Sequence, residues 1–155
     1  PATLPLYKMA QKGLALQVGC NSQKLSYVDV DDVVDAIIKM TSEIEDNHKI
    51  YYISNPKATD SSLLGREIGK SLGKNIILIR VPKFVLYPAM IISTIFSRIL
   101  GIQNKLDQKQ YKLMIQPAFL CSSENLKRDL GWEPKYDLKS SISKAVTGYR
   151  RVGLL

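Results

Sequence analysis

The pattern of apolar and polar positions changes its period once within residues 26–42. Residues 27–30 are β-branched or aromatic at alternate positions, which predicts a short strand. Asp31 then offers a side-chain acceptor suited to a helix N-cap. From there the period is about 3.6, which predicts a helix that lays an apolar face on a sheet. The apolar face comprises Val33, Val34, Ile37, Ile38 and Thr41, and the polar face comprises Asp32, Asp35, Lys39 and Ser42.

Segments of strand and helix pattern alternate through the first half of the chain. We expect a helix over residues 4–12, which Gly13 ends, and a strand over residues 14–18. Residues 49–54 have strand composition, and residues 59–72 combine capping side chains with apolar residues at fourfold spacing before Gly73. Residues 75–81 read as a buried strand. This order predicts an α/β fold.

Residues 84–100 are the most hydrophobic segment of the sequence. About 14 uncharged residues precede Arg98 and Pro88 lies among them, whereas a membrane-spanning helix needs about 20 apolar residues. We therefore expect no stable membrane span. The segment is interpreted as a helix that is buried between protein surfaces or covers an apolar pocket, and the alternative is a helix on a membrane surface.

The last third of the sequence predicts three helices with recognisable ends. Residues 107–114 are followed by a break at Pro117. Ser122 or Ser123 is placed to cap the next helix, and Gly131 to end it. Asp137 is placed to cap the final helix, whose apolar face includes Leu138, Ile142, Ala145, Val146 and Tyr149.

Length and composition indicate one globular domain over residues 1–155. The formal net charge of +8 raises the possibility of a nucleic-acid ligand. The basic residues, however, are separated singly by apolar positions and form no block with interleaved aromatics, so we expect no nucleic-acid partner. Cys20 and Cys121 lie far apart and His48 is the only histidine, which predicts reduced thiols, no metal site and a cytoplasmic protein.

Three segments in the correct order carry a resemblance to a known family: the junction at residues 30–40, the strand and helix pattern of residues 51–72, and the C-terminal tail. The sequence Val-Asp-Asp-Val-Val-Asp-Ala-Ile at residues 30–37, and Leu-Gly-Trp-Glu-Pro at residues 130–134 before a final helix ending Gly-Tyr-Arg-Arg, are similar to late motifs of the extended short-chain dehydrogenase/reductase family. This family includes the NAD(P)-dependent epimerases, dehydratases and reductases, among them nucleoside-diphosphate-sugar epimerases. The resemblance implies the C-terminal portion of a Rossmann-type protein, with strands, helices and a mostly helical substrate-binding lobe.

The family's motifs for cofactor and catalysis are missing. None of the nine glycines forms the Gly-rich turn that brings a backbone close to a pyrophosphate, and no convincing Tyr-x-x-x-Lys pair occurs. We therefore expect a chain that lacks the N-terminal dinucleotide-binding half. NAD or NADP would be bound mainly by that half, and the present chain alone would be inactive. No catalytic or cofactor-binding residue is assigned.

The substrate implied by the resemblance is apolar. Family members that act on nucleotide sugars have an arginine at the position of Leu25-Ser26 and a second basic residue near residues 115–119, and both positions are uncharged here. The chain thus looks closer to the dihydroflavonol-reductase and hydroxysteroid-dehydrogenase branches, with hydride transfer at a carbonyl or alcohol carbon. The candidate substrate-binding residues are Tyr7, Leu25, Tyr27, Tyr87 and Met90, each of which could instead be ordinary packing.

Two further hypotheses remain open at this point. The first is a non-catalytic member of the family that binds a nucleotide or a partner. The second concerns assembly: if the strand expected over residues 49–53 lacks neighbours, its unpaired edge and exposed helix faces would favour a homo-oligomer.

Overall fold

The computed structural model describes residues 3–19, 21–43, 49–101 and 107–155. Its helices are α1 (Leu4–Gln11), α2 (Val30–Glu43), α3 (Ser61–Ser71), α4 (Lys83–Leu100), α5 (Gln108–Met114), α6 (Glu124–Leu130) and α7 (Leu138–Arg151). Its strands are β1 (Leu14–Val18), β2 (Lys24–Leu25), β3 (Thr59–Asp60), β4 (Ile77–Val81) and β5 (Ala118–Phe119). The predicted α/β fold class is confirmed.

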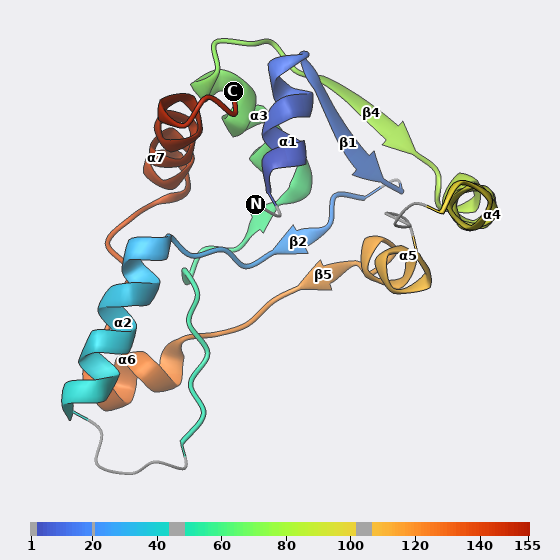
Figure 1. Cartoon of the computed structure of the whole chain (residues 1–155). Coiled ribbons are helices and arrows are strands. Elements are labelled where there is room, and N and C mark those ends of the chain that lie inside the picture. Colours follow the sequence, from blue (N-terminus) through green and yellow to red (C-terminus); the bar gives the residue numbers. More distant parts are fainter. Residues whose placement is uncertain (1–2, 20, 44–48, 102–106) are drawn as a thin grey trace.

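The strands form two small sheets (Figure 1). In the first, β1 and β4 run parallel, with Leu14 opposite Ile77 and Val18 opposite Val81. In the second, β2 lies between β3, which is antiparallel to it, and β5, which is parallel to it. Strands distant in sequence therefore lie side by side.

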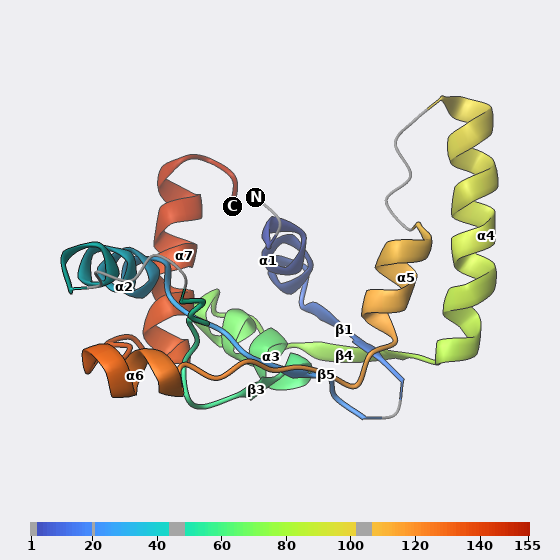
Figure 2. The same cartoon turned by 90° about the horizontal axis from the view of Figure 1, so that it is seen from below.

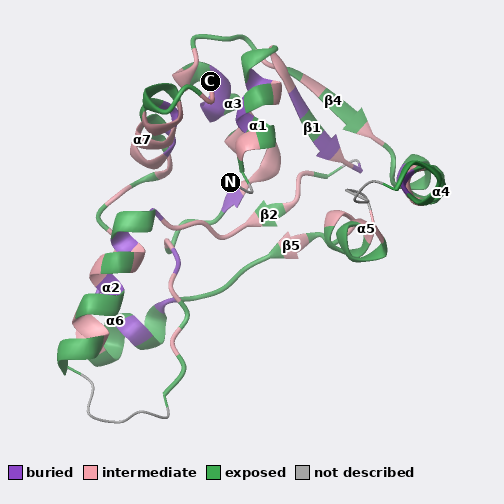
Figure 3. Cartoon of the chain, viewed as in Figure 1, coloured by how far each residue is buried: buried purple, intermediate pink, exposed green. Residues whose placement is uncertain are grey.

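The larger hydrophobic cluster joins the first and last helices to α3. Tyr7 and Ala10 of α1, Ile68 of α3, and Ile142 and Val146 of α7 are all buried there. This packing places α3 between α1 and α7, and β1 covers a further side of α1 and α3 (Figure 3). The predicted apolar face of the final helix is confirmed by this contact.

A second cluster holds α2 against α6. Ala36, Leu126 and Trp132 are buried, and Tyr51 and Ile53 pack on them from the extended segment between α2 and β3. Gly131 ends α6 with φ +59°, a conformation that glycine adopts without strain. The chain then turns so that Trp132 enters the cluster.

The orientation of α2 differs from the sequence prediction. The helix begins at Val30, and it is Asp29, not Asp31, whose Oδ1 accepts the hydrogen bond of a first-turn amide, at 3.0 Å from the Asp31 nitrogen. The predicted apolar stripe is exposed, with Val34 at 50% and Ile38 at 62%. The helix instead turns the face of Asp32 and Ala36 inward, because α6 and the residues after it cover that side.

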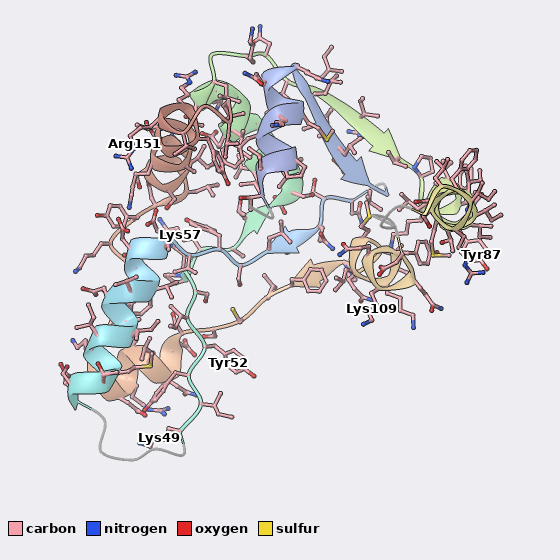
Figure 4. All side chains as sticks on the ribbon, viewed as in Figure 1. Lys49, Tyr52, Lys57, Tyr87, Lys109 and Arg151 are labelled. Carbon is pink, nitrogen blue, oxygen red and sulfur yellow. The ribbon has the colours of Figure 1, made fainter. Side chains whose placement is uncertain are left out.

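Two predicted strands are not formed. Residues 27–30 and 49–54 carry no strand ladder in the described structure, although the amide of Asn55 donates to the carbonyl oxygen of Tyr27 at 2.7 Å. A strand needs a neighbour that pairs along its length, and these two segments share only that contact. Ile50 and Tyr52 are exposed, and the side chain of Tyr52 points away from α2 and α6 (Figure 4). The expected homo-oligomer through this edge stays a prediction.

The long apolar helix α4 has its predicted extent and an unexpected environment. It runs from Lys83 to Leu100, but it stands at one end of the molecule beside α5 (Figure 2). Only Leu86 and Ser97 are buried, so the prediction of a buried helix is wrong. Among the described residues, α4 alone is long and apolar enough for a membrane span on length and composition. The strand before it, β4, is also more exposed than predicted, with Ile77 at 68%.

Two predicted helix ends are confirmed in detail. Asp137 caps α7 as predicted, by accepting from the Ser140 nitrogen at 2.8 Å. Asp107, which was expected only to lie at the start of a helix, caps α5 by accepting from the Gln110 nitrogen at 2.7 Å. Gly73 follows α3 with φ +69°. These ends are encoded within three or four residues, which is why the local sequence predicts them.

Candidate functional site

An apolar cavity of about 260 Å³ lies between α1, β1, β2 and α3. It forms because the short strand β2 leaves uncovered the inner sides of α1 and α3 near β1. Among the described residues, its only polar side chains are Gln23 and Ser61, and none of its side chains is charged. The apolar walls include Leu6, Met9, Leu16, Leu25, Leu64 and Met114.

Some of the polar groups that line this cavity are hydrogen-bonded within the fold. The Gln23 side-chain amide donates to the carbonyl oxygens of Gln116 at 2.7 Å and Leu113 at 3.2 Å. The Ser61 amide donates to the Gln23 carbonyl oxygen at 2.9 Å. The cavity therefore offers a ligand mainly dispersion and hydrophobic contacts, with few polar groups to orient it.

The pairing of β2 with β5 brings together residues 25–26 and residues 115–119. At these two positions nucleotide-sugar enzymes are expected to carry basic residues and this chain does not. Leu25 lies opposite Phe119, and the Ser26 amide donates to the Phe119 carbonyl oxygen at 2.8 Å. Both side chains are apolar where a phosphate would need a cation. The two positions therefore lie side by side, and neither carries a basic side chain.

Leu25 is the one candidate substrate-binding residue that lines this cavity. Tyr7 lies in the larger hydrophobic cluster, with its ring 5.0 Å from that of Tyr149. Burial, and then the neighbouring Tyr149, raises the pKa of Tyr7 to about 12. Tyr27 lines a separate cavity of about 500 Å³ between α6, residues 55–57 and the segment that joins α6 to α7, and burial raises its pKa.

The remaining two candidates lie on α4. Tyr87 is 53% exposed, and its ring is 5.8 Å from that of Tyr111 on α5. Met90 is half-buried, and its carbonyl oxygen accepts from the Thr94 hydroxyl at 2.9 Å. The structure thus does not bring the five candidates together, and their role in substrate binding stays a prediction.

The walls that sequence reasoning missed come from α1, β1 and α3. Leu6 and Met9 are three residues apart on α1 and face the same side. That spacing was a usable signal for an apolar surface. The position of Leu16 opposite α3 depends on the pairing of β1 with β4, and residues as far apart in sequence as Leu16 and Ile79 give no local sign of that pairing.

A charged cluster near the second cavity ties α7 to α2. The Lys144 ammonium donates to the carboxylates of Asp29, at 2.9 Å, and Asp31, and lies 3.6 Å from the centre of the Tyr136 ring. Hydrogen bonds with Asp29 and then Asp31 raise the pKa of Lys144. Burial alone would raise the pKa of Asp29, but its bonds to Lys144 and to the Asp31 amide bring that pKa below its usual value. Every charge in this cluster has a partner, so it reads as structural.

The described residues contain neither a pyrophosphate cradle for a dinucleotide nor a cluster of metal ligands. The positive-φ glycines end helices or strands separately, at Gly13, Gly19, Gly73, Gly101, Gly131 and Gly153. No strand among the described elements enters a helix through a Gly-rich turn, so these residues do not form a pyrophosphate cradle. Within the same part of the chain, no group of three His, Cys, Asp or Glu side chains is arranged to hold a metal ion.

Comparison with solved structures identifies the fold. The protein gox2253 superposes on all of this chain with TM-score 0.69 and 20% identity, over 45% of its own length. UDP-glucose 4-epimerase from Thermotoga maritima, solved with UDP-glucose, matches 95% of the chain with TM-score 0.63 and 19% identity, over 38% of its length. A dTDP-glucose 4,6-dehydratase from Bacillus anthracis, solved with NAD, matches 96% with TM-score 0.57 and 16% identity, over 39% of its length.

The chain therefore has a fold found in NAD-dependent epimerases and dehydratases, and it spans about two fifths of the length of the structures that it matches. The predicted resemblance is confirmed at the level of the fold. No family model matches the sequence. No curated protein matches it either.

Proposed function

We propose that this chain forms the substrate-binding part of an NAD(P)-dependent epimerase, dehydratase or reductase that acts on an uncharged, apolar substrate. The observation that supports the substrate class is the 260 Å³ cavity, whose described lining carries no charge and includes Leu25. The fold shared with NAD-dependent enzymes supports the reaction class, in which a carbonyl or alcohol carbon exchanges a hydride with a nicotinamide.

In this proposal the chain binds and orients the substrate, and the dinucleotide is held by a separate polypeptide segment. The described residues lack a pyrophosphate cradle, and none of the eight tyrosines is followed by lysine four residues later. The cavity is slightly smaller than the roughly 300–1,000 Å³ of drug-sized ligand sites. We therefore expect a compact ligand of one or two rings.

The test measures binding to the 155-residue chain by saturation-transfer NMR. Acetophenone serves as a small uncharged ketone, and UDP-glucose serves as a nucleotide sugar. We expect acetophenone to bind and UDP-glucose not to bind, because the described cavity offers apolar contacts and no cation for a phosphate.

A matched pair of variants locates the binding. Leu6 lines the cavity and is 46% exposed, whereas Leu63 does not line it and is 43% exposed. Leu6→Arg places a charge beside the ligand and is expected to weaken acetophenone binding by roughly tenfold, since the guanidinium must be desolvated or must fill the space. Leu63→Arg should leave binding unchanged. Equal losses in both variants, or tighter binding of UDP-glucose than of acetophenone, would contradict the proposal.

A non-catalytic binding module is the second candidate, favoured by the missing Tyr-x-x-x-Lys pair. The two candidates differ in the upstream sequence of the native gene product. An intact catalytic tyrosine and Gly-rich turn there would support the enzyme, and their absence would support the binding module.

A further inference from the structure

The helix α4 exposes most of its large apolar residues to solvent. Its inner side carries both apolar and hydroxyl side chains at the buried and half-buried positions Leu86, Ala89, Met90, Ser93, Thr94 and Ser97. Its solvent side carries large apolar residues, among them Ile99 at 74% exposure. The other strongly exposed apolar side chains of α4 are Phe84, Val85, Ile91, Ile92, Ile95, Phe96 and Leu100. A surface helix of a soluble protein normally shows the opposite arrangement.

The inner, hydroxyl-bearing side of α4 needs no additional partner. The Thr94 hydroxyl donates to the Met90 carbonyl oxygen at 2.9 Å, and the Ser97 hydroxyl donates to the Thr94 carbonyl oxygen at 2.9 Å. Lys83, at the first turn, donates to the Ile115 carbonyl oxygen at 3.0 Å and fixes the start of the helix to the segment after α5. The unsatisfied surface is therefore the outer, apolar side.

Nothing in the described chain covers that outer side. The helix α4 extends away from the two hydrophobic clusters and packs on α5 (Figure 2). None of its residues lines either cavity discussed above. A contiguous exposed apolar surface of this extent indicates a surface that is buried in a complex with something apolar.

The charges around this surface favour an anionic partner. Residues 83–114 contain five basic residues and one acidic residue, Asp107, whose carboxylate is engaged as the cap of α5. Arg98, Lys109 and Lys112 are exposed and form no ion pair with the carboxylates that the structure describes. Lys109 extends from α5 into solvent at the same end of the molecule as Tyr87 (Figure 4).

We propose that the outer side of α4 docks on an anionic phospholipid bilayer, with the helix in the interfacial plane. An exposed apolar helix face with Arg98 on the same helix and with Lys109 and Lys112 on the adjacent α5 has the composition of interfacial helices. The exposed Tyr87, near one end of the helix, has the amphipathic ring that is enriched at that depth. The helix is long enough for a span, but its inner side packs on α5 and Arg98 lies in its last turn, so we place it in the interfacial plane and not across the bilayer. This inference is independent of the enzymatic activity.

The experiment measures co-sedimentation of the full 155-residue chain with lipid vesicles. One set contains phosphatidylcholine only, and the other contains phosphatidylcholine with about 30% phosphatidylserine. We expect binding to be at least about tenfold tighter to the anionic vesicles, because basic side chains near an anionic surface each strengthen binding several-fold. Raising the salt concentration should remove most of that difference.

Two pairs of variants test the assignment to α4. Ile95→Glu with Ile99→Glu should abolish vesicle binding, whereas the same change at Ile37 and Ile38, which are similarly exposed on α2, should preserve it. For charge, glutamine at Arg98, Lys109 and Lys112 should remove the preference for phosphatidylserine. Glutamine at Lys8, Lys139 and Arg151, on α1 and α7, should retain it.

The outcomes separate lipid from a protein partner. Circular dichroism of each variant confirms that it is folded before its binding is scored, and sedimentation velocity measures self-association. Loss of vesicle binding in the α4 variants alone supports the proposal. It is overturned if the folded wild-type chain ignores anionic vesicles, if the α2 variant loses binding equally, or if the α4 variant only converts a dimer to a monomer.

Discussion

Replacing Asp32 with alanine should destabilise the contact between α2 and the start of α7 strongly. Asp32 is 1% exposed, and its carboxylate accepts from the backbone nitrogens of Lys135 at 2.9 Å and Tyr136 at 3.2 Å. Alanine leaves both donors without this acceptor, and an unsatisfied buried donor costs about 1–3 kcal/mol. Because the two amides are only partly buried, we expect a loss of about 2–4 kcal/mol in the free energy of unfolding.

The chain contains a built-in probe for this measurement. Trp132 is the only tryptophan, is 2% exposed, and lies in the hydrophobic cluster that α2 forms with α6. Urea unfolding followed by its fluorescence therefore reports on this region. For a urea dependence of about 2 kcal/mol per molar, the midpoint of Asp32→Ala should fall by about 1–2 M. Asp32→Asn keeps one acceptor oxygen and should lie between the two.

Asp35→Ala is the matched control on the same helix. Asp35 follows Asp32 by three residues on α2. Its carboxylate pairs with the Lys135 ammonium at 2.9 Å, and both side chains are well exposed. Exposed ion pairs contribute little to stability. If the midpoint of Asp32→Ala falls no further than that of Asp35→Ala, the buried carboxylate does not hold the two segments together and the argument fails.

Three other substitutions give signed predictions from the same urea assay. Lys144→Met should destabilise the chain more at pH 7 than at pH 3, because the lowered pKa of Asp29 gives a stabilisation that is present above about pH 4 and is lost as the pH falls through that pKa; a difference that is constant with pH would refute it. Gly69→Ala should lose about 1–3 kcal/mol, since its Cβ would lie 2.1 Å from Cγ1 of Ile76, whereas Gly148→Ala, with open space around it, should gain about 0.5–1 kcal/mol. Equal effects at the two glycines would contradict the packing described.

The sequence predicts this fold best where the signal is local. The cap Asp137 and the terminating Gly131 each act within a few residues, and both lie where the pattern indicated. The apolar spacing of residues 84–100 likewise predicted a helix of nearly the observed length. The same spacing could not predict which elements that helix contacts, because periodicity identifies an apolar face without identifying the surface that packs on it.

The failures concern pairing between distant segments. Residues 49–54 have strand composition, but a ladder needs a neighbour along its whole length, and only the contact between Asn55 and Tyr27 is formed. The prediction that Val34 and Ile38 of α2 are buried is wrong for a related reason. Two faces of that helix are apolar enough to be buried, and α6 covers the face of Ala36.

The candidate site was predicted in part. The sequence marked the positions of Leu25 and of residues 115–119 as uncharged, and their adjacency through β2 and β5 appeared only in the structure. Tyr7 illustrates the opposite case, because a tyrosine at a helix position can face a ligand or a core with equal ease. Its neighbours on α3 and α7 decide between the two, and they are more than 50 residues away in sequence.

The contact between the first and last helices also determines when the molecule can fold. The Thr3 and Tyr149 hydroxyls are 2.9 Å apart although 146 residues separate them, and the larger cluster needs α7 to be complete. At roughly 5–20 residues per second, a ribosome takes about 7–30 s to proceed from one contact partner to the other. Throughout that interval the apolar sides of α1 and α3 lack their cover. The nascent chain is then most prone to aggregate and most dependent on chaperones.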